Sequence, residues 1–202
     1  MNPTLATALV MLAAYLIGSL SFAVISSRLF RLPDPHTYGS GNPGATNVLR
    51  TGNKIAAALT LLGDGLKGFV AVWLAYSIGK YWGDPHAAAS GAALAVFIGH
   101  LYPLFHRFAG GKGVATAAGI VFALSWPLGI ALIALWLVMV VVFRISSLAA
   151  LTAALATPPL GFYVLGNGPE AWILVPIALL LVWRHRSNIA KLLSGRERRI
   201  GH

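Results

Sequence analysis

The feature that most constrains this chain of 202 residues is a succession of apolar stretches, most of them long enough for a membrane-spanning helix. Such a helix needs about 20 predominantly apolar residues. The stretches cover residues 4–27, 55–79, 87–105, 114–125, 128–143, 147–165 and 171–183. Hydrophobic residues make up 57% of the chain and charged residues 10%, whereas a soluble domain carries about a quarter of its residues as charges. The sequence therefore predicts an all-α, polytopic membrane protein.

The number of spans depends on the fourth stretch, which is short and is separated from the fifth by Trp126-Pro127. The two stretches could form one long kinked helix, giving six spans, or two separate helices, giving seven. Seven spans with an outside N-terminus place thirteen of the fifteen Lys and Arg residues in the inside segments 28–54, 106–113, 144–146 and 184–202. Because cytoplasmic loops carry an excess of Lys and Arg, this pattern predicts seven spans with a cytoplasmic C-terminus.

Composition also limits the domain organisation and the kinds of site. No repeat or pair of inverted halves is visible, so residues 1–202 are predicted to form a single membrane domain. The chain contains no cysteine, which excludes disulfides, thiolate nucleophiles and cysteine metal sites. Its net charge of +10 is explained by membrane topology, and we expect no nucleic acid partner.

The first candidate site is the segment Gly39 to Arg50, which is unusually rich in glycine and short polar residues. Its three glycines, at positions 39, 41 and 44, allow backbone N–H groups to turn toward an anion. Arg50 adds a planar guanidinium suited to phosphate. The polar side chains available for binding are Ser40, Asn42, Thr46 and Asn47. The segment is predicted to bind an anion, although a polar turn between two spans has the same composition.

The second candidate site is a Gly-Gly-Lys-Gly turn, residues 110–113, that leads into a predicted helix. Free N–H groups at a helix N-terminus and the Lys112 ammonium together form a favourable site for an anion. A glycine hinge with a lysine extending to the membrane surface is the alternative. His100, upstream of this turn, is interpreted as a structural polar group.

Further candidates lie near span ends and within the second span. Ser147 follows Arg144 at the inside end of one span, and His185 and Asn188 have the i, i+3 spacing of one helical face. The basic tail that contains them and Glu197 could alternatively bind anionic lipid. Asp64 and Lys67 lie within the second span, where ionisable groups are costly. They are expected to pair with each other and to shape the floor of the site, and direct catalysis is the alternative.

Absent motifs narrow the chemistry further. The five acidic residues are scattered and cannot form the carboxylate cluster of a metal-dependent phosphotransferase. Neither a His-x-x-x-x-Asp acyltransferase motif nor a Gly-x-Ser-x-Gly nucleophile motif is present. The remaining cationic and N–H-rich segments suit one or two small phosphorylated substrates. An organophosphate or anion transporter stays an alternative, but it needs a path to both faces and the outside connections contain few polar residues. A lipid-binding structural protein would leave the two glycine-rich segments unexplained.

These motifs resemble the bacterial acyl-phosphate:glycerol-3-phosphate acyltransferase family, whose members are integral membrane enzymes. The similar segments are Gly39 to Arg50, Asp64 to Gly68, Gly99 to Thr116, Arg144 to Leu148 and His185 to Glu197. They occur in the family order and cover about a quarter of the chain. Lys191 departs from the pattern, because the family has Arg there. The resemblance implies seven spans, an outside N-terminus and a cytoplasmic active site.

The resemblance implies transfer of an acyl group from acyl phosphate to the 1-hydroxyl of glycerol 3-phosphate, forming lysophosphatidic acid and phosphate. It assigns catalytic roles to Ser40, Lys112, His185 and Asn188. Substrate-binding roles fall to Asn42, Thr46, Asn47, Arg50, Gly110, Gly111, Gly113 and Ser147. Supporting roles fall to Asp64, Lys67, His100 and Glu197. The general base is either His185 or a phosphate oxygen of a substrate.

The same resemblance defines the expected surroundings of the protein. Its partners would be glycerol 3-phosphate, acyl phosphate and membrane lipids. We expect no cofactor and no metal, and function as a monomer. The expected location is the bacterial cytoplasmic (inner) membrane, crossed several times, with the active site on the cytoplasmic face.

Overall fold

The computed structural model describes residues 3–200, and every regular element within that range is a helix. In chain order the elements are α1 (Pro3–Gly18), α2 (Phe22–Leu29), α3 (Ala45–Leu49), α4 (Lys54–Trp82), α5 (Pro85–Leu101), the short 3₁₀ helix η1 (Leu104–His106), α6 (Val114–Leu124), α7 (Trp126–Phe143), α8 (Ser146–Leu165), α9 (Pro169–Arg184) and α10 (Arg186–Leu193). The all-helical prediction is confirmed.

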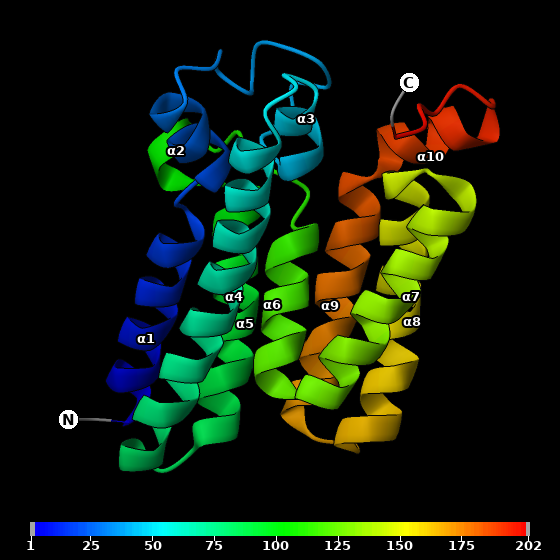
Figure 1. The fold of residues 1–202 in the computed structure, drawn as a ribbon. Helices are drawn as coiled ribbons and strands as arrows, with labels where there is room; N and C mark the ends of the chain where they lie inside the picture. Colours follow the sequence, from blue (N-terminus) through cyan, green and yellow to red (C-terminus); the bar gives the residue numbers. More distant parts are fainter. Residues whose placement is uncertain (1–2, 201–202) are drawn as a thin grey trace.

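The long helices lie side by side, and the two ends of the bundle differ (Figure 1). Short helices α2, α3 and α10 gather with their loops at one end, where the chain also finishes, and α1 begins at the other end. Five stretches are long and apolar enough to cross a membrane: Leu5–Leu29, Lys54–Tyr81, Pro85–His106, Trp126–Phe143 and Ser146–Leu165. Helices α9 and α10, bent by 58°, would together make a sixth. The chain therefore has the architecture of a polytopic membrane protein.

Helix α6 is the element on which the span number depends, because it has only 11 residues. It ends at Leu124, and Ser125 is extended, with φ −158°. The Ser125 side chain then accepts a hydrogen bond from the Leu128 N–H and caps α7. Figure 1 shows α7 running back beside α6. The two are therefore separate helices and do not form one kinked helix.

The first apolar stretch is interrupted where the sequence predicts a continuous span over residues 4–27. Helix α1 stops at Gly18, and α2 starts at Phe22 with Ser21 as its N-cap. A Cβ atom at Gly18 would lie 2.2 Å from the Val96 carbonyl oxygen, so glycine permits the close approach of α1 to α5. The interruption frees the Leu20 carbonyl, which accepts a hydrogen bond of 2.6 Å from Lys67 Nζ.

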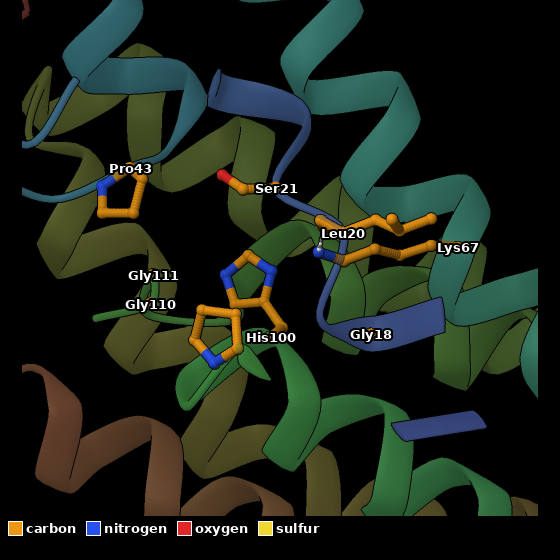
Figure 2. Close-up of a pocket in the computed structure, with 9 residues that line it drawn as sticks. Gly18, Leu20, Ser21, Pro43, Lys67, His100, Gly110 and Gly111 are labelled. Carbon is orange, nitrogen blue, oxygen red and sulfur yellow. Dashed lines mark hydrogen bonds between the residues drawn. The ribbon is translucent and has the colours of Figure 1, made fainter. Parts of the chain in front are cut away.

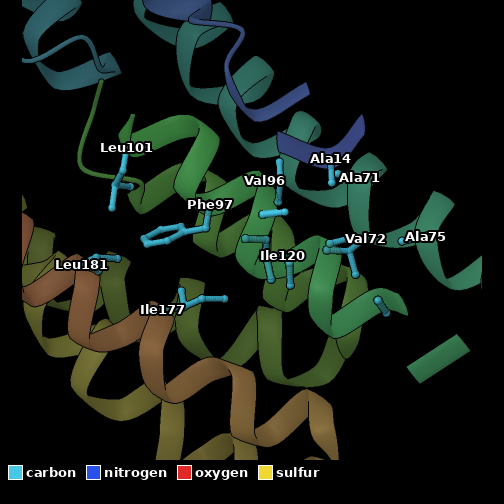
Figure 3. Packing of buried hydrophobic residues seen from close by; sticks show 14 of the residues in the cluster. Ala14, Ala71, Val72, Ala75, Val96, Phe97, Leu101, Ile120, Ile177 and Leu181 are labelled. Atoms are coloured by element: carbon cyan, nitrogen blue, oxygen red, sulfur yellow. The ribbon is translucent and has the colours of Figure 1, made fainter. Parts of the chain in front are cut away.

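The main core lies between α1, α4, α5, α6 and α9 (Figure 3). Its largest buried side chains are Phe97, Leu101, Ile120, Ile177 and Leu181. Many of its other members are alanines, which bring the helices close together. Elsewhere α7 exposes large apolar side chains to the surroundings, among them Val138, Val141 and Val142. An exposed apolar face of this kind fits lipid contact.

Candidate active site

The segment from Gly39 to Arg50 is organised around the buried side chain of Asn47. Asn47 Nδ2 donates to the carbonyl oxygens of Pro35 and Tyr38, at 2.9 and 3.2 Å. Asn47 Oδ1 accepts from the Ser40 N–H at 2.9 Å, and from the Ser40 hydroxyl and Arg50 Nη1 at 3.2 Å each. These bonds fill the capacity of the Asn47 amide. The geometry favours a role for Asn47 in holding Ser40 and Arg50 in place.

Gly39 is required by this arrangement. Its φ is +61°, and a Cβ atom there would lie 2.2 Å from Asn47 Oδ1. Arg50 is exposed, so its guanidinium can bind further ligands while Asn47 holds one edge. Asn42 is half-buried and Thr46 is exposed in the same segment. The segment therefore presents Ser40 and Arg50 as neighbours.

The turn over residues 110–113 is fixed by contacts from three other parts of the chain. The Arg184 guanidinium donates to the carbonyl oxygens of Gly110 and Gly111, at 2.7 and 3.1 Å. The Gly111 N–H donates to the His100 carbonyl at 3.2 Å. His36 Nε2 donates at 2.9 Å to the carbonyl of Ala109, the residue before the turn, and so links the turn to the chain just ahead of the first segment.

Glycine is sterically necessary in this turn. A Cβ atom at Gly111 would lie 2.3 Å from His100 Nε2 and 3.0 Å from the Pro43 carbonyl oxygen. Gly113 has φ +85° and precedes α6, so the first N–H groups of that helix have no acceptor within it. The turn thus combines a close backbone approach with a helix N-terminus.

A chain of hydrogen bonds joins the turn to the tail. Lys112 Nζ donates to Asn188 Oδ1, Asn188 Nδ2 donates to Glu197 Oε1, and each distance is 2.6 Å. The buried Ser147 hydroxyl at the start of α8 donates to the same Glu197 oxygen, also at 2.6 Å. Four predicted residues from distant parts of the sequence are therefore brought together.

Burial and neighbouring charges set the properties of Lys112. Burial lowers the pKa of its ammonium from the ordinary value to about 8, while the nearby Glu197 carboxylate acts in the opposite direction. The cations Lys191, Arg50 and Arg184 also lie close enough to lower it. Such a concentration of positive charge favours anionic ligands. The close approach of Gly111 to the Pro43 carbonyl brings the first segment and the turn together.

His185 lies at the junction of α9 and α10 and is buried. Its Nδ1 lies 2.8 Å from the Leu181 carbonyl oxygen. Because a carbonyl only accepts, Nδ1 carries the proton, and Nε2 is the nitrogen available to take one. The sequence prediction placed His185 and Asn188 on one helical face; in the structure the chain bends by 58° between the helices that flank His185.

The supporting residues form a buried polar group beside the turn, and Figure 2 shows two of them, His100 and Lys67, with Gly110 and Gly111. Lys67 Nζ lies 2.9 Å from Asp64 Oδ1, which confirms the predicted pair. Thr116 Oγ1 donates to the Asp64 carbonyl at 2.9 Å and lies 3.1 Å from His100 Nδ1. A water-sized cavity of about 10 Å³ is lined by His100, Lys67, Pro43, Pro103, Gly18, Leu20, Ser21, Gly110 and Gly111. This group connects α4, α5 and α6, and its His100 ring lies against Gly111.

Sequence reasoning missed Arg184 and His36 as parts of the site. Arg184 was included in the basic tail but received no role of its own, and its partners lie 73 and 74 residues away. His36 precedes the glycine-rich segment and contacts a carbonyl 73 residues further on. No spacing in the sequence marks either contact, so the folded chain was needed to find them.

Fold and site together define a class: an integral membrane protein with a cationic, N–H-rich site where several loops meet at one end of a helical bundle. The chain belongs to the glycerol-3-phosphate acyltransferase family, because the family model described as "Glycerol-3-phosphate acyltransferase" matches residues 8–195. The family resemblance inferred from the sequence is therefore confirmed.

Individual relatives agree with this assignment. A glycerol-3-phosphate acyltransferase of Cupriavidus pinatubonensis is 60% identical over 98% of this chain and 98% of its own length. That of Ralstonia pickettii is 59% identical over 100% of this chain and 97% of its own. The crystal structure of PlsY (YgiH), an integral membrane glycerol 3-phosphate acyltransferase in its glycerol 3-phosphate form, matches with a TM-score of 0.88 and 37% identity, covering 96% of each chain. Its lysophosphatidic acid form matches with a TM-score of 0.85.

Proposed function

We propose that this protein transfers a fatty acyl group from acyl phosphate to the 1-hydroxyl of glycerol 3-phosphate, as the first step of phospholipid biosynthesis. The observation that carries the proposal is the match, over 96% of the chain, to a structure in glycerol 3-phosphate and lysophosphatidic acid forms. The site supports it, because two separate anion-binding segments come close together. Two anionic substrates can therefore be held together there.

In this reaction the 1-hydroxyl oxygen of glycerol 3-phosphate bonds to the carbonyl carbon of the acyl phosphate. The bond from that carbon to the phosphate oxygen breaks, and inorganic phosphate leaves with the electron pair. Phosphate is a good leaving group, so alignment of the substrates and neutralisation of their charge can supply much of the catalysis. The hydroxyl proton passes to His185 Nε2 or to a phosphate oxygen of a substrate.

The residues divide between the two substrates. We assign Ser40, Arg50, Ser147, His185 and Asn188 to glycerol 3-phosphate, and the turn over residues 110–113 to the acyl-phosphate head. Asn47 then acts by positioning Ser40 and Arg50, and Glu197 by aligning Ser147 and Asn188. Asp64, Lys67 and His100 support the turn through the His100 ring, which lies against Gly111. Asn42 and Thr46 remain candidate contacts of the first segment.

We further propose seven spans, with the N-terminus outside and the active site on the cytoplasmic face of the inner membrane. The positive charge of the loops at one end of the bundle supports this orientation. Helix α6 would cross the bilayer inside the bundle, where its neighbours α4, α5, α7 and α9 compensate for its short length. We expect the protein to function as a monomer.

The proposed activity is tested with the purified full-length protein, palmitoyl phosphate and glycerol 3-phosphate. We expect equal amounts of lysophosphatidic acid and phosphate, with no loss of rate in EDTA and no turnover when acyl-CoA or acyl carrier protein replaces the donor. Inactivity with palmitoyl phosphate, or similar rates with acyl-CoA, would contradict the proposal.

A further inference from the structure

Arg184 makes an unusual contact with the glycine turn, because its guanidinium binds two consecutive backbone carbonyls. Nη2 donates to the Gly110 oxygen at 2.7 Å and Nε donates to the Gly111 oxygen at 3.1 Å. The Nε–H and Nη2–H groups on one edge of the planar guanidinium therefore donate to adjacent carbonyls at the same time. The guanidinium also lies over the Tyr102 ring, with 5.7 Å between its carbon and the ring centroid. Arg184 is half-buried, and its position is defined by both contacts.

These two bonds determine which way the peptide groups of the turn point. In a trans peptide the C=O and the following N–H point in opposite directions. With the Gly110 carbonyl held by Arg184, the Gly111 N–H points away from it, and this N–H does reach the His100 carbonyl at 3.2 Å. With the Gly111 carbonyl held in the same way, the Lys112 N–H also points away from Arg184.

An anion site in this turn needs this orientation. Glycine tolerates many backbone conformations, so an unrestrained Gly-Gly pair can rotate its peptides and present carbonyl oxygens, which repel phosphate. Both Gly110 and Gly111 are buried, so their carbonyl oxygens need hydrogen-bond partners. Arg184, at the end of α9, donates hydrogen bonds to both carbonyl oxygens. The two carbonyl groups therefore point toward Arg184 and not toward the anion.

We propose that Arg184 is a positioning residue for the acyl-phosphate head: it fixes the Gly110 and Gly111 carbonyls so that the Lys112 N–H and the Lys112 ammonium face the donor phosphate. The inference rests on the proposed function and assigns a residue to the donor half of the site. It predicts a defect confined to the donor, because the Arg184 hydrogen bonds go to this turn and not to the segment that carries Ser40 and Arg50.

The test compares steady-state kinetics of Arg184→Ala, Arg184→Lys and a matched control, Arg186→Ala. Arg186 is two residues away and equally cationic, but it is exposed and lies over the Trp183 ring at 4.5 Å. Loss of two charge-assisted bonds in Arg184→Ala should raise KM for palmitoyl phosphate by about tenfold or more. The inhibition constant of inorganic phosphate, a probe of the same subsite, should rise in parallel. KM for glycerol 3-phosphate should stay within about twofold, as should all constants of Arg186→Ala.

A conservative variant and two contrary results complete the test of the Arg184 role. Arg184→Lys should recover only part of the donor affinity, because a single ammonium cannot hold both carbonyls in the fork geometry. If Arg184→Ala does not fold, Tyr102→Ala, which removes the ring beneath the guanidinium, should give the same donor-specific change to a smaller degree. Equal rises in both KM values, or a lowered Tm with unchanged KM values, would refute the positioning role. Inactivity of the unmodified protein with palmitoyl phosphate would instead refute the proposed function.

Discussion

Lys112 shows how a single side chain can depend on residues far from it in the sequence. The hydrogen bond to Asn188 and the nearby Glu197 carboxylate place its ammonium in a defined position within a partly buried site. Burial disfavours the charged form and lowers the pKa of Lys112 to about 8, despite the opposing effect of Glu197. The positive charge that would attract the donor phosphate is therefore lost within an experimentally accessible pH range.

A pH profile tests this assignment. Because the protonated fraction of Lys112 falls as the pH rises through about 8, kcat/KM for palmitoyl phosphate should decline above that pH. This ratio reports ionisation of the free enzyme. Lys112→Arg should have a lower maximum but no such decline, because arginine stays protonated. Glu197→Gln removes the charge that raises the lysine pKa, so its decline should begin at lower pH. Three identical profiles, corrected for donor hydrolysis without enzyme, would exclude Lys112 as the titrating group.

Arg50 provides the corresponding test for the acceptor. Asn47 holds one edge of its exposed guanidinium and leaves the rest for glycerol 3-phosphate. A charge-assisted bond contributes roughly 1.5–3 kcal/mol, so Arg50→Ala should raise KM for glycerol 3-phosphate by at least about tenfold. Arg50→Lys should recover part of this loss. Arg28→Ala removes an exposed cation in α2 as a control and should change KM by less than about twofold. An unchanged KM in Arg50→Ala would leave this segment as a structural turn.

At the residue scale, the sequence predicted some of these relationships and not others. The Asp64–Lys67 pair followed from spacing and the cost of charge inside a bilayer, and it is present. Asn47 was predicted to bind substrate because of its residue type, whereas its amide is occupied by the loop itself. Arg184 was indistinguishable from other tail cations, since its role depends on a contact across more than 70 residues. Local spacing therefore finds local pairs and misses long-range ones.

Among the elements, α4 and α6 make an unusually close contact that glycine permits. A Cβ atom at Gly68 would lie 2.4 Å from the Thr116 carbonyl oxygen, and one at Gly119 would lie 1.9 Å from the Gly65 carbonyl oxygen. Small residues allow helix backbones to approach in membranes, where packing supplies much of the attraction between helices. This contact fixes the helix that begins directly after the anion-binding turn, despite its length of 11 residues.

The contact gives a prediction with a control on the same interface. Gly119→Ala places a methyl group against backbone atoms of α4, which cannot move aside as a side chain could, so we expect a loss of stability of about 1–3 kcal/mol or more. Gly65→Ala meets the Ala115 carbonyl oxygen at 3.6 Å, an ordinary contact, and should be neutral or slightly stabilising. Thermal unfolding in detergent micelles, followed by tryptophan fluorescence, measures both. Equal Tm values for the two variants would argue against close packing at Gly119.

Element boundaries were predicted well by hydrophobicity except where polar contacts interrupt a helix. The interruption after Gly18 lies inside an apolar stretch and is stabilised by Ser21 and by the bond from Lys67 to the Leu20 carbonyl. The bend at His185 follows an apolar helix and precedes a basic one. An average over apolar residues cannot identify either position, because each depends on a few specific hydrogen bonds.

Over the whole molecule, charge and hydrophobicity are distributed in a way that defines orientation. The loops with most of the cations gather at the end that contains α2, α3 and α10, whereas the α8–α9 connection lies at the end where α1 begins (Figure 1). The sequence predicted this asymmetry from the positive-inside pattern alone. The same pattern favoured seven crossings over six, although the hydrophobic length of α6 is below the usual requirement. The packing of α6 against its neighbours supports a crossing.

Labelling of single introduced cysteines decides the crossing number, since the natural chain contains none. Cysteines at Ser194 and Gly168 define the two sides: with intact cells, a membrane-impermeant thiol reagent should modify Gly168→Cys and leave Ser194→Cys unmodified until the cells are permeabilised. Ala109 and Trp126 flank α6 and are both exposed. If α6 crosses the membrane, Ala109→Cys should behave like Ser194→Cys, and Trp126→Cys like Gly168→Cys. Reaction of Ala109→Cys and Trp126→Cys from the same side would rule out a crossing by α6 and with it the proposed seven spans.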